Sequence, residues 1–235
     1  MDLSLLRSDP IQFLLNLCYY LPCILLSLSA HEAAHAYAAL KMGDESQRYR
    51  GRISLNPLNH VEPIGFLALL LTGFGWAKPV QVNMYNFRDS RKGMAITAIA
   101  GPLANFILMI AAVILGGLCD LAIFKLGEGF AETVFSVLGN FFFYLALLNV
   151  GLGLFNLIPI PPLDGSRVLG LILPDRIYYR VMQYERYGFL VLIGLLFIGN
   201  YIPRLDIIGN WLYVARSFVL NGAYDIVYGI LNLFV

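Results

Sequence analysis

Charged residues are scarce in this chain, and their scarcity excludes an ordinary water-soluble domain. They make up 13% of the 235 residues, about half of the roughly 25% that soluble domains contain. Hydrophobic residues make up 59%, and the mean hydropathy is +0.71. We therefore expect a protein embedded in a lipid bilayer. The net charge of +1 offers little attraction for a polyanion, so nucleic acid is not an expected partner.

Cysteines and N-terminal basic residues are also few. The three cysteines, Cys18, Cys23 and Cys119, are odd in number and scattered, which excludes a disulfide framework. We expect them to pack as small apolar side chains. Arg7 is the one basic residue before the first apolar run, so the basic region of a signal peptide is missing. We expect the first apolar segment to be retained.

Long apolar runs dominate the rest of the chain. They cover roughly residues 11–40, 93–117, 131–158, 187–202 and 207–235. A bilayer span needs about 20 apolar residues, which the first three runs provide. The fourth run is short. The fifth carries Arg216 and Asp225, and it either spans, lies at the interface or breaks near Asn221.

A region rich in proline and glycine, residues 43–92, separates the first two spans. Its apolar stretch Ile64–Leu71 is too short to cross a bilayer alone. Arg52–Leu55 and Val80–Met84 alternate polar and apolar residues, as half-buried strands do. These patterns predict a small membrane-associated β element with a loop that dips into the membrane.

Together these features predict an all-α polytopic membrane protein with about five to six transmembrane helices and the small β element between the first two spans. We expect one domain over residues 1–235. Its core would cover about residues 11–173, and additional C-terminal helices would cover about 187–235.

Basic residues gather on one side of the predicted bilayer. Twelve lie in loops on that side: Lys41, Arg48, Arg50, Arg52, Lys78, Arg88, Arg91, Lys92, Arg167, Arg176, Arg180 and Arg186. The opposite side carries three: Arg7, Lys125 and Arg204. The positive-inside rule then predicts an external N-terminus and a cytosolic end of the first span. We expect an integral protein of the cell membrane.

The first apolar run contains the motif His31-Glu32-Ala33-Ala34-His35. Ionisable groups at membrane depth are costly and usually functional. His31 and His35 share one helix face and suit two zinc ligands, while Glu32 suits a general base acting on water. A purely structural hydrogen-bonded cluster is the alternative. The motif lies about 14 Å from the predicted cytosolic end of its helix, so the site is expected toward that face.

A zinc site built on this motif needs a third protein ligand. His60, the remaining histidine, is one candidate, although it could equally pack against backbone. Asp164 is the candidate we favour. It follows Pro159, Pro161 and Pro162, which cannot continue a helix, so the third span should unwind there and direct the carboxylate inward. An Asp-Gly pair after prolines is also common in surface turns.

Several segments accompany these residues. They are Leu55-Asn56-Pro57-Leu58-Asn59-His60-Val61-Glu62-Pro63-Ile64-Gly65, Gly75-Trp76-Ala77-Lys78-Pro79-Val80, Ala100-Gly101-Pro102-Leu103-Ala104-Asn105, Asn156…Pro161-Pro162-Leu163-Asp164-Gly165 and Glu185-Arg186-Tyr187-Gly188. With the histidine motif, they resemble the site-2 protease family over about residues 28–200. Two loop positions depart from the family pattern: Glu62 stands in place of Asp, and Gln81 in place of Pro.

The resemblance implies an intramembrane zinc metalloprotease that cleaves peptide bonds in or near transmembrane segments of membrane proteins. It implies one zinc ion held by His31, His35 and Asp164, with Glu32 as catalytic base and Asn156 supporting the substrate or the oxyanion. Accessory PDZ or CBS domains are not expected. Two other classes stay open: a zinc-binding membrane transporter or channel, and an inactive relative that binds membrane clients.

Overall fold

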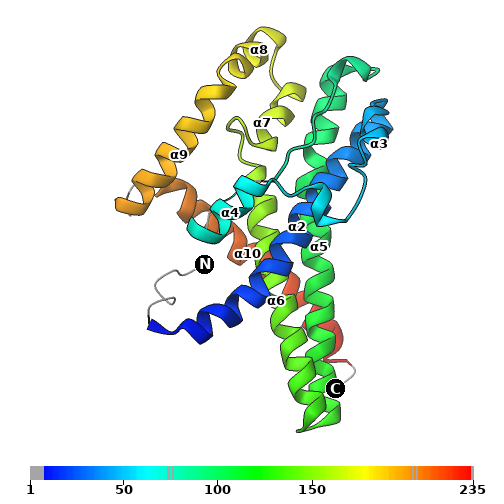
Figure 1. Cartoon of the computed structure of the whole chain (residues 1–235), viewed down its shortest axis with the longest axis vertical. Helices are drawn as coiled ribbons and strands as arrows, with labels where there is room; N and C mark the ends of the chain where they lie inside the picture. The colour runs from blue at the N-terminus through cyan, green and yellow to red at the C-terminus, as the bar shows by residue number, and fades with distance from the viewer. Residues whose placement is uncertain (1–7, 73–74, 76, 203, 205, 234–235) are drawn as a thin grey trace.

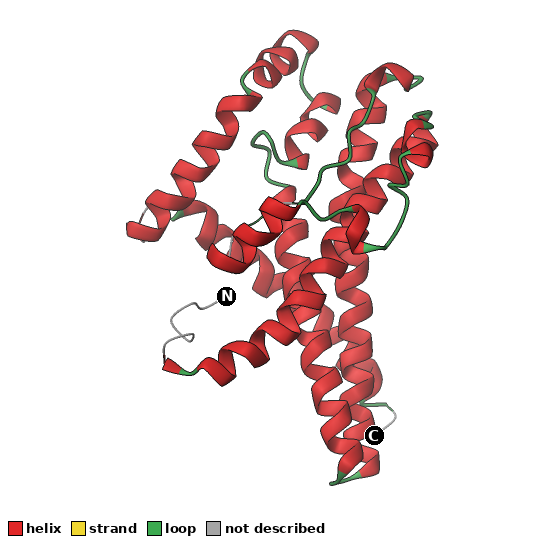
Figure 2. Cartoon of the chain, in the orientation of Figure 1, coloured by secondary structure: helices red, strands yellow, loops and turns green. Residues whose placement is uncertain are grey.

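The computed structural model is almost entirely helical, as Figure 2 shows. It describes residues 8–72, 75, 77–202, 204 and 206–233. Arg7 and Trp76, which carried part of the sequence interpretation, lie outside the described residues. The predicted all-α class is confirmed.

Three long helices form the frame of the molecule: α2 (Pro10–Met42), α5 (Ser90–Leu126) and α6 (Phe130–Asn156). Each is long and apolar enough to cross a bilayer. α5 and α6 pack side by side, and α2 crosses them (Figure 1). Their shared hydrophobic core also includes one residue of the later helix α10 (Ile207–Leu231). The buried residues of this core are Cys23, Met109, Ala112, Val113, Leu145, Ala146, Val150, Leu154 and Leu220.

Shorter elements lie between and after these three helices. They are α3 (Ser46–Tyr49), η1 (Pro57–Asn59), α4 (Pro63–Thr72), η2 (Met84–Asn86), α7 (Asp164–Val168), η3 (Leu169–Leu171), α8 (Asp175–Gln183), α9 (Glu185–Tyr201) and α10 (Ile207–Leu231). In Figure 1, α8 and α9 stand apart from the crossing of α2 with α5 and α6. The site described below lies where α2, α5 and α7 meet.

Two of the long helices begin after an aspartate that caps them. The Asp9 carboxylate accepts the Gln12 N–H at 3.0 Å and caps α2, and Pro10 occupies the first helical position, where its missing N–H has no cost. Asp89 caps α5 in the same way, accepting the Lys92 N–H at 3.0 Å. Both caps satisfy backbone donors that the first helical turn leaves free.

The predicted β element is not found among the described residues, and this prediction is corrected. Region 43–92 forms short helices and irregular backbone, with a single antiparallel bridge between Val61 and Ala77. The alternation of polar and apolar residues marks extended backbone here, but that backbone is not paired into a sheet.

Side chains take the place of strand pairing in this region. Arg52 donates hydrogen bonds to the carbonyl oxygens of Asn59 (2.5 Å) and Pro79 (3.0 Å). Gln47 is fully buried and donates to the carbonyl oxygen of Gln81 at 2.9 Å. Because buried carbonyl groups need a partner of any kind, these donors satisfy the backbone without a neighbouring strand.

The expected five to six spans are not confirmed. Within the described residues, the three helices above meet the length and hydropathy of a span. A fourth is reached if the pair Arg176–Gln183 and Tyr187–Gly199, bent by 69°, counts as one broken span. The break considered near Asn221 is absent, because α10 runs continuously through it.

Asp44 ties the end of α2 to the segment before α5. This buried carboxylate accepts the Asn83 N–H (2.9 Å), the Ser46 N–H (3.2 Å), and the amide groups of Gln47 (2.9 Å) and Asn86 (2.8 Å). Burial tends to raise the pKa of the Asp44 carboxyl, but these four hydrogen bonds outweigh it and hold the pKa well below its usual value.

We expect this carboxylate to make part of the stability pH-dependent. Because its pKa is lower in the folded state, its contribution is complete above its ordinary pKa of about 4 and is lost as the pH falls further. Asp44→Asn should lower stability at pH 7 by roughly 1–3 kcal/mol and weaken the acid dependence, as measured by thermal unfolding in detergent between pH 7 and pH 2. The exposed neighbour provides the control Glu45→Gln, which should behave as wild type. An unchanged acid profile in Asp44→Asn would contradict the assignment.

Candidate metal centre

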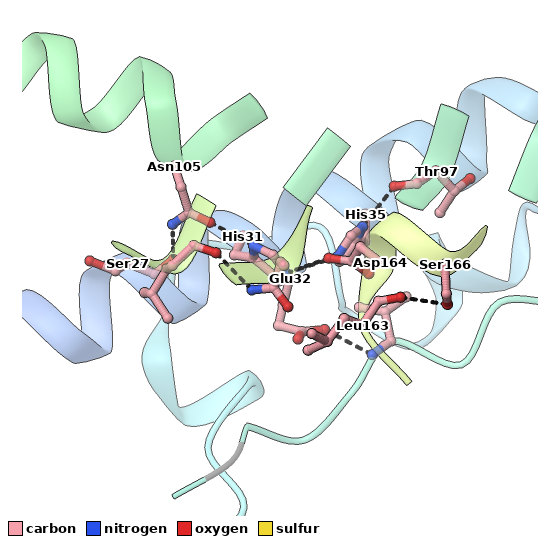
Figure 3. Close-up of polar contacts among 12 residues, drawn as sticks. Ser27, His31, Glu32, His35, Thr97, Asn105, Leu163, Asp164 and Ser166 are labelled. Carbon is pink, nitrogen blue, oxygen red and sulfur yellow. Dashed lines mark hydrogen bonds and ion pairs between the residues drawn. The ribbon is translucent and has the colours of Figure 1, made fainter. Parts of the chain in front are cut away.

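Two histidine side chains and one aspartate side chain meet inside the helical frame (Figure 3). His31 and His35 lie one turn apart on α2 and are both buried. Their Nε2 atoms are 3.0 Å apart. Asp164 Oδ2 lies 3.2 Å from Nε2 of His31 and 3.3 Å from Nε2 of His35. The structure therefore brings together the three residues that the sequence suggested as ligands.

Each imidazole is held through its other ring nitrogen. His35 Nδ1 lies 2.7 Å from the backbone carbonyl oxygen of Thr97. A carbonyl oxygen only accepts, so His35 carries a hydrogen on Nδ1, and in the neutral imidazole the lone pair is on Nε2. His31 Nδ1 lies 2.6 Å from the amide oxygen of Asn105, which requires the same arrangement. Both Nε2 lone pairs are thus available at the point where Asp164 arrives.

The three converging atoms are all hydrogen-bond acceptors, and this is the test of whether a metal fits. Asp164 Oδ2 is buried and accepts no hydrogen bond from the described part of the chain. Buried acceptors so close together are unfavourable unless a cation lies between them. In a tetrahedral zinc site with bonds of about 2.0–2.1 Å, ligand atoms are about 3.3 Å apart, which agrees with the observed separations. The residues fit a divalent metal with one position open.

Asp164 reaches the histidines because α6 stops before it. α6 ends at Asn156, Pro159 cannot continue it, and the chain turns until α7 begins at Asp164. The adjacent Gly165 packs so closely that a Cβ there would lie 2.2 Å from the carbonyl oxygen of Leu157. A residue without a side chain is therefore required beside the ligand.

Gly101 plays a comparable part on α5. A Cβ at this position would lie 2.4 Å from His35 Nε2 and 2.6 Å from His31 Cε1. The glycine therefore lets the backbone of α5 approach both imidazole rings, so that Thr97 and Asn105 on the same helix can bond to them.

Glu32 lies in the wall of a cleft beside the candidate ligands. The cleft has a volume of about 720 Å³, within the usual range for ligand sites. Glu32 Oε2 accepts the backbone N–H of Val80 at 2.9 Å. Residues on both sides of Val80 line the same cleft. The carboxylate is therefore close to the metal ligands, held by a backbone bond and open to a bound molecule.

The other two predicted residues have different surroundings. Asn156 lines the same cleft, and its Nδ2 donates to the carbonyl oxygen of Leu152 at 3.1 Å. His60 is buried elsewhere, with Nε2 at 2.7 Å from the carbonyl oxygen of Ser54. It does not join the candidate metal group found among the described residues. Of the two candidates for the third ligand, Asp164 is the one that lies beside the histidines.

Three further residues at the site had no role assigned from sequence. Asn105 was recognised within a motif, but its contact with His31 depends on how α2 and α5 cross. Thr97 acts through its backbone, which leaves no trace in the side-chain pattern. Arg167 lines the cleft and pairs with Glu185 at 2.6 Å. The sequence could have indicated Arg167 through its position three residues after Asp164, which puts both residues on the same face of α7.

A comparison with protein families gives one match. The model described as Peptidase family M50 covers residues 19–198. No solved structure matches the chain significantly.

Individual relatives occur in bacteria and in the archaeon Methanocaldococcus jannaschii. YwhC of Bacillus subtilis is 37% identical over 198 residues, which cover 80% of this chain and 86% of that protein. Rip2 of Mycolicibacterium smegmatis is 30% identical over 177 residues, covering 73% of this chain and 64% of the relative. Both names place these relatives among zinc metalloproteases. A further relative, whose name is "Regulator of sigma-W protease RasP" in Bacillus subtilis, is 35% identical over 80 residues, or 34% of this chain and 18% of RasP.

We expect Gly101→Ala to weaken metal binding, because the new methyl group would push α5 away from both imidazoles. The loss in zinc affinity should be about tenfold or more, measured by competition with a chelator on the purified protein in detergent. Gly151→Ala on α6 is the matched control, since a Cβ there meets nothing within 4 Å. Equal zinc affinities in the two variants would show that the close approach of α5 is not needed.

Proposed function

This chain belongs to peptidase family M50, and on that premise we propose how its residues carry out proteolysis within the membrane. The protein is an intramembrane zinc metalloprotease, a hydrolase of membrane-protein substrates. The observation that carries the proposal is the convergence of His31, His35 and Asp164 beside Glu32 and an open cleft.

His31, His35 and Asp164 would hold one zinc ion, as their acceptor atoms and separations suit. When bound, zinc supplies Lewis acidity that polarises a carbonyl group and lowers the pKa of a water. Two histidines and one carboxylate leave a coordination position for water or substrate. The assignment of these three residues is part of the proposal.

Glu32 is the general base of the proposed mechanism. Its carboxylate takes a proton from the attacking water, the water oxygen bonds to the scissile carbonyl carbon, and the C–N bond breaks as the proton passes to the leaving amine. The Val80 N–H bonded to Oε2 fixes the orientation of this carboxylate. We assign Asn156 the role of donating to the carbonyl oxygen as negative charge develops there. One of its two amide hydrogens is bonded to Leu152, which leaves the second for this purpose.

The substrate is proposed to be a transmembrane segment of another membrane protein. The peptide bonds of such a segment are protected by its own helical hydrogen bonds, so it must unwind before attack. The cleft of about 720 Å³ would receive the unwound part. The extended backbone on either side of Val80 forms one wall of this path.

We propose that the protein resides in the cell membrane with its site toward the cytosol. The end of α2, the start of α5 and α7 with α8 lie at one end of the molecule (Figure 1). The sequence assigns twelve basic residues to this side of the bilayer, in the connecting segments and at the adjoining helix ends. An excess of arginine and lysine marks cytosolic segments. The same rule gives the N-terminus an external location.

A metal transporter is the second candidate, since polar groups at membrane depth are also typical of transport sites. The neighbouring Glu32 favours hydrolysis, because a carboxylate next to the ligands supplies the proton transfer that peptide cleavage needs. Transport would require no such base, and it would release no fragments.

We expect Glu32→Gln to keep zinc and to lose cleavage by at least about 100-fold, because the amide cannot accept the proton. Membranes that contain either form are compared by proteomics, and zinc is measured in the purified proteins. Glu45→Gln, at an exposed position, makes the same charge change as a control. Fragments that persist in Glu32→Gln would rule out this base. A wild-type protein that binds zinc but releases no fragments would favour transport or client binding.

A further inference from the structure

Two asparagine side chains are completely buried between the three long helices. Asn105 lies on α5 and Asn149 on α6, and neither is exposed. They bond to each other at 2.8 Å, from Asn105 Nδ2 to Asn149 Oδ1. Both lie beside Ser27 of α2, which is also fully buried. Polar groups in such a place must be hydrogen-bonded, and each bond restricts the direction of the next.

Backbone carbonyl groups determine the direction of the whole chain of bonds. Asn149 faces the carbonyl oxygen of Leu145 at 2.8 Å, and a carbonyl oxygen only accepts, so the NH₂ group of Asn149 must face it. The second hydrogen of that group reaches Ser27 Oγ at 2.8 Å, and Ser27 Oγ in turn donates to the carbonyl oxygen of Cys23 at 2.6 Å. The amide oxygen of Asn149 is therefore turned toward Asn105.

The orientation of Asn105 follows from that of Asn149. Its NH₂ group must face the amide oxygen of Asn149, and it also lies 3.4 Å from the carbonyl oxygen of Ser27. The amide oxygen of Asn105 is left for His31 Nδ1, 2.6 Å away. An acceptor at this nitrogen requires the hydrogen of His31 to be on Nδ1. In the neutral imidazole the lone pair is then on Nε2, the atom that faces His35 and Asp164 (Figure 3).

We propose that Asn105 and Asn149 are positioning residues for the metal centre, which together hold His31 in the tautomer and ring orientation that a metal requires. This proposal depends on the proposed function in one respect, namely that zinc binds at this site. His35 obtains the same tautomer from a backbone carbonyl group. The two histidines of the motif are thus oriented by different partners. The partner of His31 is a side chain, which a substitution can remove, whereas the partner of His35 is backbone.

A purely structural role gives a different expectation. Buried amide pairs also hold membrane helices together, and their loss would then lower stability without changing metal affinity. A positioning role predicts weaker zinc binding even when the protein stays folded. It also predicts that Asn149, which bonds to Asn105 rather than to a ligand, influences zinc through Asn105.

The double variant Asn105→Leu/Asn149→Leu tests this most directly. It replaces both amides with apolar groups of similar size, so neither amide is left facing an apolar partner, and the cost to folding is smaller than that of removing one of them. We expect its zinc affinity to fall by about 10- to 100-fold, the usual effect of removing a ligand's hydrogen-bond partner. Affinity is measured by chelator competition on the full chain in detergent. The visible absorption of the cobalt-loaded protein, which depends on coordination geometry, should change as well.

The single variants separate the two residues. Asn105→Leu and Asn149→Leu should each weaken zinc binding, and the double variant should lose no more than Asn105→Leu alone, because both act through one contact with His31. Ser29→Ala is the matched control. Ser29 is buried on α2 and bonds to the carbonyl oxygen of Leu25 at 2.6 Å, as Ser27 does to its own turn, but it has no bond to the amide pair.

Each outcome has a distinct meaning. If the double variant binds zinc as tightly as Ser29→Ala and its cobalt spectrum is unchanged, the positioning role is overturned, whatever the melting temperatures. Losses that add in full between the single variants also contradict a relay through Asn105. If the wild-type protein binds no zinc, the proposed function fails rather than this inference. Should the single variants not fold, the double variant against wild type still decides the question.

Discussion

The rest of this structure depends on one constraint: three acceptor atoms converge with no hydrogen-bond donor between them. His31, His35 and Asp164 bring acceptor atoms to within 3.0–3.3 Å of one another in a protein whose surroundings are largely apolar. Such an arrangement is unfavourable by itself, so it must be held by the surrounding helices and compensated by a cation. The packing of α2 against α5 and the turn before α7 hold these three side chains in place.

The helices around the centre divide this task. α2 contributes both histidines and the proposed base Glu32. α5 contributes the groups that orient the imidazoles, and α7 contributes the Asp164 carboxylate. Small residues occur where backbones must come closest: Gly101 lies against the imidazoles, and Gly165 lies against the end of α6. Buried amides and backbone carbonyl groups satisfy the second ring nitrogens. A bilayer offers few hydrogen-bond partners, so this internal pairing is what permits polar chemistry at such a depth.

Much of this could be predicted from the sequence, and the failures have physical causes. The long helices were predictable because apolar runs of this length have one stable form in lipid, and Asp164 was predictable because prolines end the helix before it. The β element was not, since period-two alternation reports extended backbone but not what pairs with it, and here Arg52 and Gln47 do. The bond between Asn105 and His31 depends on helix crossing, which no local pattern contains. The roles of Glu32 and Asn156 remain predictions.

The attachment of the cleft wall to α2 has a mechanical consequence. Val80 is bonded to Glu32 on α2, and Asn83 is bonded to Asp44, which follows the C-terminal cap of α2. The segment before α5 is therefore attached at two points to α2 and the residues that end it. This segment cannot move outward without breaking these hydrogen bonds, one of which is to the proposed base Glu32. Any widening of the cleft at this wall would therefore also release the Glu32 carboxylate from its hydrogen bond to the backbone.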